Sequence, residues 1–305
     1  MNAAPRRSLL ALAAPLLLAA CAAGDDGSSP GHDGVPQVVA TTTQVGSVVR
    51  ELGGDAVAIT VLLAPGVEAH DFEMTPQAAA ALEEADLVLL SGAGLEDWLA
   101  DSIAAARDAG RVVDLSSGVE LRMIDGATDP HYWLAAPGAT RMVENARDAL
   151  LALAPDAAED IDGRADALLD RLDAADAEVR RLIEEVPPAD RQLVTDHDAL
   201  GYFVDAYGLE FVGSIFPSLD VTAEPSAQEI ETLVAQIRDR GVRAIFTESS
   251  VNPRLAEAIA SESDAQLVTE PLYTDALGPD GSGAETLDGV LVHNATVIRD
   301  GLLGD

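Results

Sequence analysis

The sequence contains no lysine, and its 18 basic residues, all of them arginine, face 53 acidic ones, which gives a formal net charge of −35 over 305 residues. A surface this acidic repels phosphates, which argues against nucleic acid and anionic lipid headgroups as partners. It raises the local concentration of divalent cations, but only loosely and in a salt-dependent way. A compositional bias of the source genome or a salty habitat accounts for most of the charge. Composition by itself therefore favours a metal function only slightly.

Cysteine occurs once, at Cys21, so no disulfide can form within the chain. The apolar stretch 9–20 follows Arg6 and Arg7 and is too short to span a bilayer as a permanent helix. It ends at 18–21 with the sequence LAAC, which resembles the bacterial lipobox, in which the cysteine is acylated and becomes the mature N-terminus. We therefore expect residues 1–20 to be a cleaved signal peptide and acyl chains on Cys21 to hold the protein at a membrane. The alternative is an ordinary signal peptide with a chance cysteine nearby.

Residues 21–36, which start at this cysteine, are rich in Gly, Asp, Ser and Pro and show no apolar periodicity. They predict a flexible tether that lets the folded part stand off the outer face of the cytoplasmic membrane. His32 lies in the tether and could catch a stray cation, but a solvated linker residue is the simpler interpretation. The pair Arg6 and Arg7 weakly resembles a twin-arginine signal, so the general secretory and twin-arginine export routes both stay open.

The rest of the chain is long enough for two domains of about 120 to 150 residues each. Short apolar runs rich in β-formers alternate there with helical patterns. These runs are 37–42, 57–63, 87–91 and 111–115 in the first half and 192–195, 211–215, 244–247 and 266–269 in the second. Strands that alternate with helices form parallel sheets covered on both faces. We therefore expect an α/β fold of two similar lobes, 37–154 and 188–305, each a mostly parallel sheet flanked by helices.

The segment 155–187 between the lobes has a different pattern. It is dense in Ala, Asp, Arg and Leu, and Pro187 and Pro188 stop it. Its apolar residues fall near helical spacing, at Ile161, Leu168, Leu172, Val179, Leu182, Ile183 and Val186. A single helix of about 30 residues would be about 45 Å long and would join the lobes rigidly. The alternative is a pair of shorter helices broken at Gly163.

Three of the five histidines and one aspartate lie in short motifs that follow strand-like runs. They are His70, His131, His197 and Asp275, two in each expected lobe. All four lie beyond the carboxyl ends of strands, where open α/β sheets bind their ligands, so we expect them to meet in the cleft between the lobes. Three imidazoles and a carboxylate suit Zn(II) in a tetrahedral site. Spacing alone is weak evidence, because an isolated loop histidine is more often a surface residue.

The amino-acid sequences of these motifs are more specific evidence than their spacing. The first lobe contains HDFEMTPQ at 70–77, ADLV at 85–88, GAGLEDWL at 92–99 and DPHYWL at 129–134. The second contains TDHDALGYF at 195–203, EPSA at 224–227, AIFTESS at 244–250 and LYTDAL at 272–277. In this order, from about residue 37 to residue 302, they resemble the metal-binding lipoproteins that feed zinc and manganese ABC importers.

This resemblance implies two α/β lobes joined by one long helix, with a metal buried between them and held directly by His70, His131, His197 and Asp275. It also implies an extracytoplasmic solute-binding lipoprotein, not an enzyme, that delivers its metal to an ABC permease and the cytoplasmic ATPase of that permease. We expect it to act as a monomer. One departure is that 116–129 lacks the long His-rich loop of some zinc-specific members, so we expect no metal capture by an auxiliary loop.

The identity of the metal is a separate question. Three imidazoles favour Zn(II), whereas members that resemble manganese binders tend to have a carboxylate where this chain has His197, and oxygen ligands suit Mn(II). Zn(II) is therefore the expected cargo and Mn(II) the alternative. Glu248 ends an apolar run and could accept a hydrogen bond from a ligand imidazole, or it could simply bond to the cleft wall.

Two other classes of function remain as alternatives. A zinc metallohydrolase also uses about three protein ligands, but it needs an open coordination position, which four protein ligands would close. A metal-dependent adhesin could share the same scaffold. His293 sits in a helical pattern near the C-terminus that resembles the closing helix of the family, and we expect it to be structural.

Overall fold

The computed structural model describes residues 34–67, 69, 72, 74–124, 126–217, 224–249 and 251–304. The expected signal peptide, Cys21 and His32 lie outside these residues. Among the helices of the described part, none is both long and apolar enough to cross a membrane.

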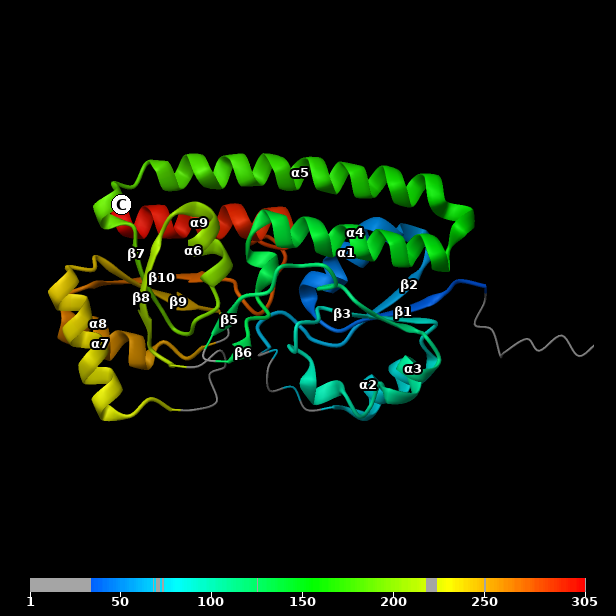
Figure 1. The fold of residues 1–305 in the computed structure, drawn as a ribbon, viewed down its shortest axis with the longest axis horizontal. Coiled ribbons are helices and arrows are strands. Elements are labelled where there is room, and N and C mark those ends of the chain that lie inside the picture. Colours follow the sequence, from blue (N-terminus) through cyan, green and yellow to red (C-terminus); the bar gives the residue numbers. More distant parts are fainter. Residues whose placement is uncertain are drawn as a thin grey trace, which may run out of the picture. The chain divides into compact units, whose positions relative to one another are not determined.

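The first half of the folded part is built on a parallel sheet with the strand order β2-β1-β3-β4 (Figure 1). Its strands are β1 (Gln37–Ala40), β2 (Ala58–Val61), β3 (Leu87–Leu90) and β4 (Val112–Asp114). Its helices are α1 (Thr43–Gly53), α2 (Pro76–Glu84), α3 (Ala104–Asp108) and α4 (Ala136–Leu153).

Both faces of this sheet are covered, which explains the continuous apolar run of β3. Leu87 and Leu89 pack into the core that contains residues of α1 and α4, whereas Val88 and Leu90 pack with Leu82 of α2 on the other face. Successive side chains of a strand point to opposite faces, so a strand covered on both faces needs apolar residues throughout.

The second half contains two pairs of parallel strands. They are β7 (Gln192–Thr195) with β8 (Glu210–Ser214) and β9 (Ala244–Glu248) with β10 (Gln266–Leu272). The helices are α6 (Gly201–Tyr207), α7 (Ala227–Arg240), α8 (Arg254–Ser263) and α9 (Leu287–Leu303). The pairs lie side by side, because β7 contacts β9. Adjacent residues of β9 again face opposite layers: Ile245 packs with α7 and α8, and Phe246 packs in the core that contains α9.

The helix α5 (Ala158–Glu184) is unbroken over 27 residues. At 1.5 Å per residue it is about 40 Å long. It packs against α4 of the first half and α9 of the second, and Figure 1 shows it running along both. Gly163 lies inside the helix, so the alternative of two shorter helices is wrong. The expected α/β fold with two lobes and one long connecting helix is confirmed.

One element was not predicted from the sequence, a short antiparallel hairpin before His131. It consists of β5 (Met123–Ile124) and β6 (Ala127–Thr128), and Gly126 in its turn has a φ of +90°. A glycine is favoured there because the left-handed region is costly for residues with a Cβ. The hairpin brings Arg122 and Asp129 opposite each other, where the amide of Asp129 donates to the carbonyl of Arg122 over 2.9 Å.

Candidate metal site

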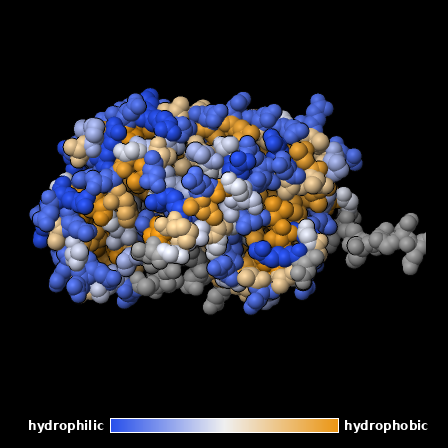
Figure 2. All heavy atoms as spheres, in the orientation of Figure 1, coloured by the Kyte–Doolittle hydropathy of each residue, from blue (hydrophilic) through white to orange (hydrophobic). Residues whose placement is uncertain are grey.

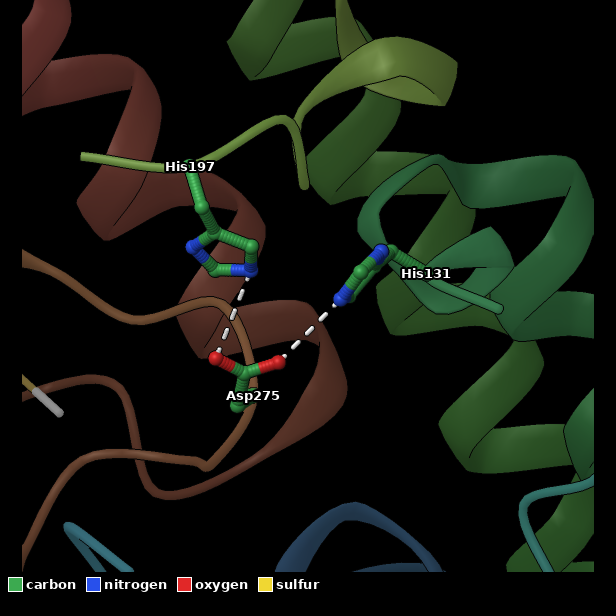
Figure 3. Close-up of side chains that lie close together, drawn as sticks. All are labelled: His131, His197 and Asp275. Atoms are coloured by element: carbon green, nitrogen blue, oxygen red, sulfur yellow. Dashed lines mark hydrogen bonds and ion pairs between the residues drawn. The ribbon is translucent and has the colours of Figure 1, made fainter. Parts of the chain in front are cut away.

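Three of the four expected ligands meet in the structure. One donor atom each of His131, His197 and Asp275 lies within 4.8 Å of the others, and all three side chains are buried (Figure 3). His131 comes from the segment between β6 and α4, His197 follows β7, and Asp275 follows β10. The fourth, His70, lies outside the described residues, although its neighbour Ala69 is described and buried.

Asp275 lies between the two imidazoles, and each of its oxygens faces one ring (Figure 3). Oδ1 is 3.1 Å from Nε2 of His131, and Oδ2 is 3.5 Å from Nε2 of His197. The two rings are 5.4 Å apart between centroids and meet edge to face. The Nε2 atoms of both histidines therefore point at the same carboxylate, as ligands that share one cation would.

The segment before Asp275 is fixed by hydrogen bonds from both halves of the molecule. The side-chain amide of Asn294, on α9, accepts from the amide of Tyr273 over 3.0 Å and donates to its carbonyl over 2.8 Å. The indole of Trp133 donates to the carbonyl of Thr274 over 3.2 Å. The backbone that carries the carboxylate is thus held before any ligand arrives.

His131 is oriented by Asp129 of the same DPH motif. One oxygen of this buried carboxylate, Oδ1, lies 2.9 Å from the imidazole Nδ1 and also accepts the His131 amide over 3.0 Å. A hydrogen bond at Nδ1 leaves Nε2 as the ligand atom and fixes the ring plane. The other oxygen of Asp129, Oδ2, accepts from the guanidinium of Arg122 over 2.8 Å.

His197 also has a buried carboxylate close to its Nδ1 atom, that of Glu248 at the end of β9. Oε2 of Glu248 lies 2.8 Å from Nδ1 of His197, and Oε1 accepts the His197 amide over 3.0 Å. The hydroxyl of Thr274 donates to Oε2, and the amide of Glu248 donates to Asp196 over 2.8 Å. Each described histidine of the site thus has a carboxylate on the side of its ring away from Asp275.

These carboxylates raise the basicity of both imidazoles. Burial lowers the pKa of His131, but hydrogen bonds with Asp129 and Asp275 outweigh it and raise the pKa to about 9. Burial likewise opposes the charged form of His197, yet the charges of Glu248 and Asp275 raise its pKa well above the usual value. Conversely, burial favours a protonated Asp275, but the two histidines lower its pKa well below its usual range. A cation that binds here must therefore displace protons from the imidazoles.

A buried carboxylate that the sequence analysis did not single out joins the segment after β3 to Thr41 in the first lobe. Glu96 accepts from the Thr41 hydroxyl over 2.6 Å and from the amides of Ser91 and Gly92 over 2.6 and 2.9 Å. Burial raises its pKa to about 7. Its place in the motif GAGLEDWL, directly after a buried strand, was the available signal. Two residues along, the Trp98 indole donates to the carbonyl of Ala69, next to His70, over 2.9 Å.

Comparison with known proteins finds relatives that are named for the metals they bind. The model of the family "Zinc-uptake complex component A periplasmic" matches residues 38–301. The manganese-binding lipoprotein MntA of Halalkalibacterium halodurans is 30% identical over 298 residues, which are 97% of each chain. The zinc-binding protein TroA of Treponema pallidum is 31% identical over 274 residues, 87% of this chain and 88% of TroA. A solved structure of the periplasmic TroA superposes with a TM-score of 0.83 over 88% of this chain and 99% of that one, at 30% identity.

Proposed function

Because the chain belongs to the family of the periplasmic component A of zinc-uptake complexes, we propose that it captures Zn(II) outside the cytoplasm and delivers it to the permease of an ABC importer. Its family and its relatives, which are named for both manganese and zinc, show that it is a metal-binding substrate-binding protein of an ABC importer and not an enzyme. Such a protein works with a membrane permease and a cytoplasmic ATPase. The observation that carries the proposal is the buried convergence of His131, His197 and Asp275.

The proposed ligands are His70, His131, His197 and Asp275. The donor set of three imidazoles and one carboxylate favours Zn(II), and carboxylates behind two of the imidazoles are the usual partners of zinc-bound histidines. Glu248 is proposed as the residue that orients His197. Mn(II) is the second candidate, favoured by the name of the H. halodurans relative. Zinc binding in vitro alone would not distinguish them, because a manganese site also binds zinc tightly.

The proposed anchor is an acyl chain on Cys21 after removal of residues 1–20, which places a monomer at the outer face of the cytoplasmic membrane. Relatives named as lipoproteins support it. Mass spectrometry of the mature N-terminus tests it: we expect an acylated Cys21, and an N-terminus at any other residue would contradict it.

The cargo is tested by competition titration of the metal-stripped mature protein against chelators, with Zn(II) and Mn(II) in parallel. We expect one tight equivalent of Zn(II) and weak Mn(II) that the chelator removes, since harder oxygen ligands are in the minority at this site. Thermal unfolding in each metal is the second readout, because a ligand that binds only the folded state raises Tm. Tight, stabilising Mn(II) would reassign the cargo, and no stoichiometric binding of either metal would overturn the function.

A further inference from the structure

Arg122 links the two histidine-bearing segments of the candidate site but is not itself a ligand. It lies directly before β5, in the hairpin that leads to His131, and its side chain is 31% exposed. The helix that faces it, α6, begins shortly after His197. A motion that carries the His131 segment away from α6 must therefore break the contacts of Arg122 with this helix.

The guanidinium of Arg122 joins carboxylates from both sides. Nη1 donates to Oδ2 of Asp129 over 2.8 Å, and Nε lies 2.9 Å from Oδ2 of Asp205 on α6. The planar fork of arginine suits such two-sided pairing, which the single ammonium of lysine cannot reproduce. Asp129 is buried, and its other oxygen is bonded to His131. The side chain of Asp129 therefore connects Arg122 directly to the imidazole.

Tyr202 of α6 completes the link. Its hydroxyl accepts the amide of Arg122 over 2.8 Å and donates to the carbonyl of Asp129 over 2.9 Å, so one phenol holds both ends of the hairpin. The Cζ atom of Arg122 lies 5.6 Å from the centre of the same ring, within the range of a cation–π contact. The hairpin is thus attached to α6 by three kinds of contact.

Gly201, at the start of α6, provides the space for this guanidinium. A Cβ built on Gly201 would lie 1.3 Å from Nη1 of Arg122, so any other residue there must displace the arginine. The φ of Gly201 is not in the left-handed region, and the need for glycine here is steric. The guanidinium of Arg122, from the first lobe, therefore packs directly against the backbone of α6, in the second lobe.

We propose that Arg122 is a positioning residue that latches the His131 hairpin to α6 and thereby slows metal release. The inference rests on the proposed metal binding. Because α5 is a single helix that packs along both halves, we expect little hinge motion between them, so release requires local movement of a ligand-bearing segment. The latch opposes movement of the segment that carries His131. Asp129 in that segment is bonded to Arg122 and to Tyr202 of α6, and these bonds must break before the segment can move away from α6. Partners that orient a metal-ligating histidine typically change metal affinity by about 10- to 100-fold.

The test is the rate at which Zn(II) leaves the loaded mature protein when excess chelator is added, compared among variants. Arg122→Ala should release Zn(II) about 10- to 100-fold faster than the unsubstituted protein. Gly201→Ala, which displaces the guanidinium without removing it, should also accelerate release. Asp205→Asn removes only the exposed second-lobe partner, 65% exposed, and is expected to accelerate release by up to about fivefold, the range of a surface ion pair.

The variant Arg122→Lys tests whether Arg122 acts by bridging Asp129 and Asp205 or only by its positive charge. It keeps the positive charge beside Asp129 but cannot span to Asp205, so we expect release nearly as fast as in the alanine variant. Release at the original rate in Arg122→Lys would show that charge alone matters and would overturn the latch. The same conclusion would follow if Asp205→Asn and Gly201→Ala both released Zn(II) at the original rate.

Arg180→Ala is the matched control. Arg180 also contacts α6, with its Cζ 5.1 Å from the Tyr207 ring and Nη1 donating to the carbonyl of Ala206 over 3.0 Å, but it pairs with Asp176 of α5. We expect unchanged release in this variant. Faster release in Arg180→Ala as well, in step with a lower Tm of the metal-stripped protein, would indicate a merely structural effect. If the unsubstituted protein bound no Zn(II), the proposed function would fail, whereas unchanged kinetics in a protein that binds Zn(II) would overturn the latch alone.

Discussion

Replacement of His131 by alanine is expected to weaken Zn(II) binding by on the order of 100- to 1,000-fold. Structural zinc sites have apparent binding free energies of about 10 to 16 kcal/mol, and a quarter of that for one of four ligands is about 2.5 to 4 kcal/mol, or roughly two to three powers of ten. The residue is fully buried and its Nε2 atom faces Asp275, so its truncation removes a donor atom from the interior of the cluster. Competition titration against a chelator of known affinity measures the change.

His293→Ala is the matched control for this substitution. His293 lies on α9 and is half-buried, with Nε2 3.0 Å from the carbonyl of Pro271, but it does not belong to the cluster of His131, His197 and Asp275. Its loss should change Tm without a large change in Zn(II) affinity. Near-original affinity in His131→Ala and His197→Ala together would remove the site assignment, because both imidazoles point at the same carboxylate.

The strands of the fold were predictable because buried strands consist largely of apolar residues, which the sequence shows directly. The run Leu87–Leu90 is apolar at every position and is buried at every position, and the same holds for most of β9. The long helix was predictable for a related reason: its buried residues recur every three or four positions, from Ile161 to Ile183. The alternative break at Gly163 failed because a single glycine costs a helix only about 1 kcal/mol, which packing on two neighbouring helices exceeds.

The hairpin before His131 was not predictable in this way. Its strands have two residues each, too short for alternation to show, and only the glycine at position 126 hints at a turn. Short strands persist here because tertiary contacts, such as those with Tyr202, hold them. Local sequence carries no information about such contacts.

The candidate site also contains residues that the sequence predicted and residues that it did not. His131, His197 and Asp275 were identified from motifs, since each lies in a short segment beyond a strand, and the structure brings them together. The supporting contacts of Arg122 with Asp205 and of Asn294 with Tyr273 join segments far apart in the chain, and neither residue stands out in the sequence. A single sequence predicts which residues carry the chemistry better than it predicts which residues hold them.

Zn(II) affinity is expected to fall on acidification, by about tenfold per pH unit below pH 9 through His131 and more steeply where His197 is also protonated. A histidine binds metal only when neutral, so each imidazole that holds a proton in the metal-stripped protein weakens binding about tenfold for every pH unit below its pKa. Two carboxylates raise the pKa of His131 to about 9 despite its burial, and the pKa of His197 is also raised well above the usual value. Each imidazole that carries a proton before the metal arrives gives up that proton on binding, so at neutral pH His131 should release about one proton per Zn(II) and the raised pKa of His197 should add to it.

The stability of the metal-stripped protein should change with pH in the opposite sense. The pKa of His131 is raised above the value of about 6.5 expected for an unfolded chain, so its contribution to stability is complete below pH 6.5 and is lost as the pH rises toward 9. Zn(II) binding, in contrast, strengthens over the same window. The difference in Tm between loaded and stripped protein should therefore widen between pH 6 and pH 9.

Calorimetric titration in two buffers of different ionisation enthalpy measures the released protons directly. We expect His131→Ala to release about one proton fewer than the unsubstituted protein, because the lost imidazole no longer has a proton to give up. That difference separates this account from a general effect of the acidic surface, which would give the same proton count in both proteins. An affinity that stays constant from pH 6 to pH 8 would mean that the imidazoles are neutral before the metal arrives, and that Asp129 and Glu248 orient the rings without raising their basicity.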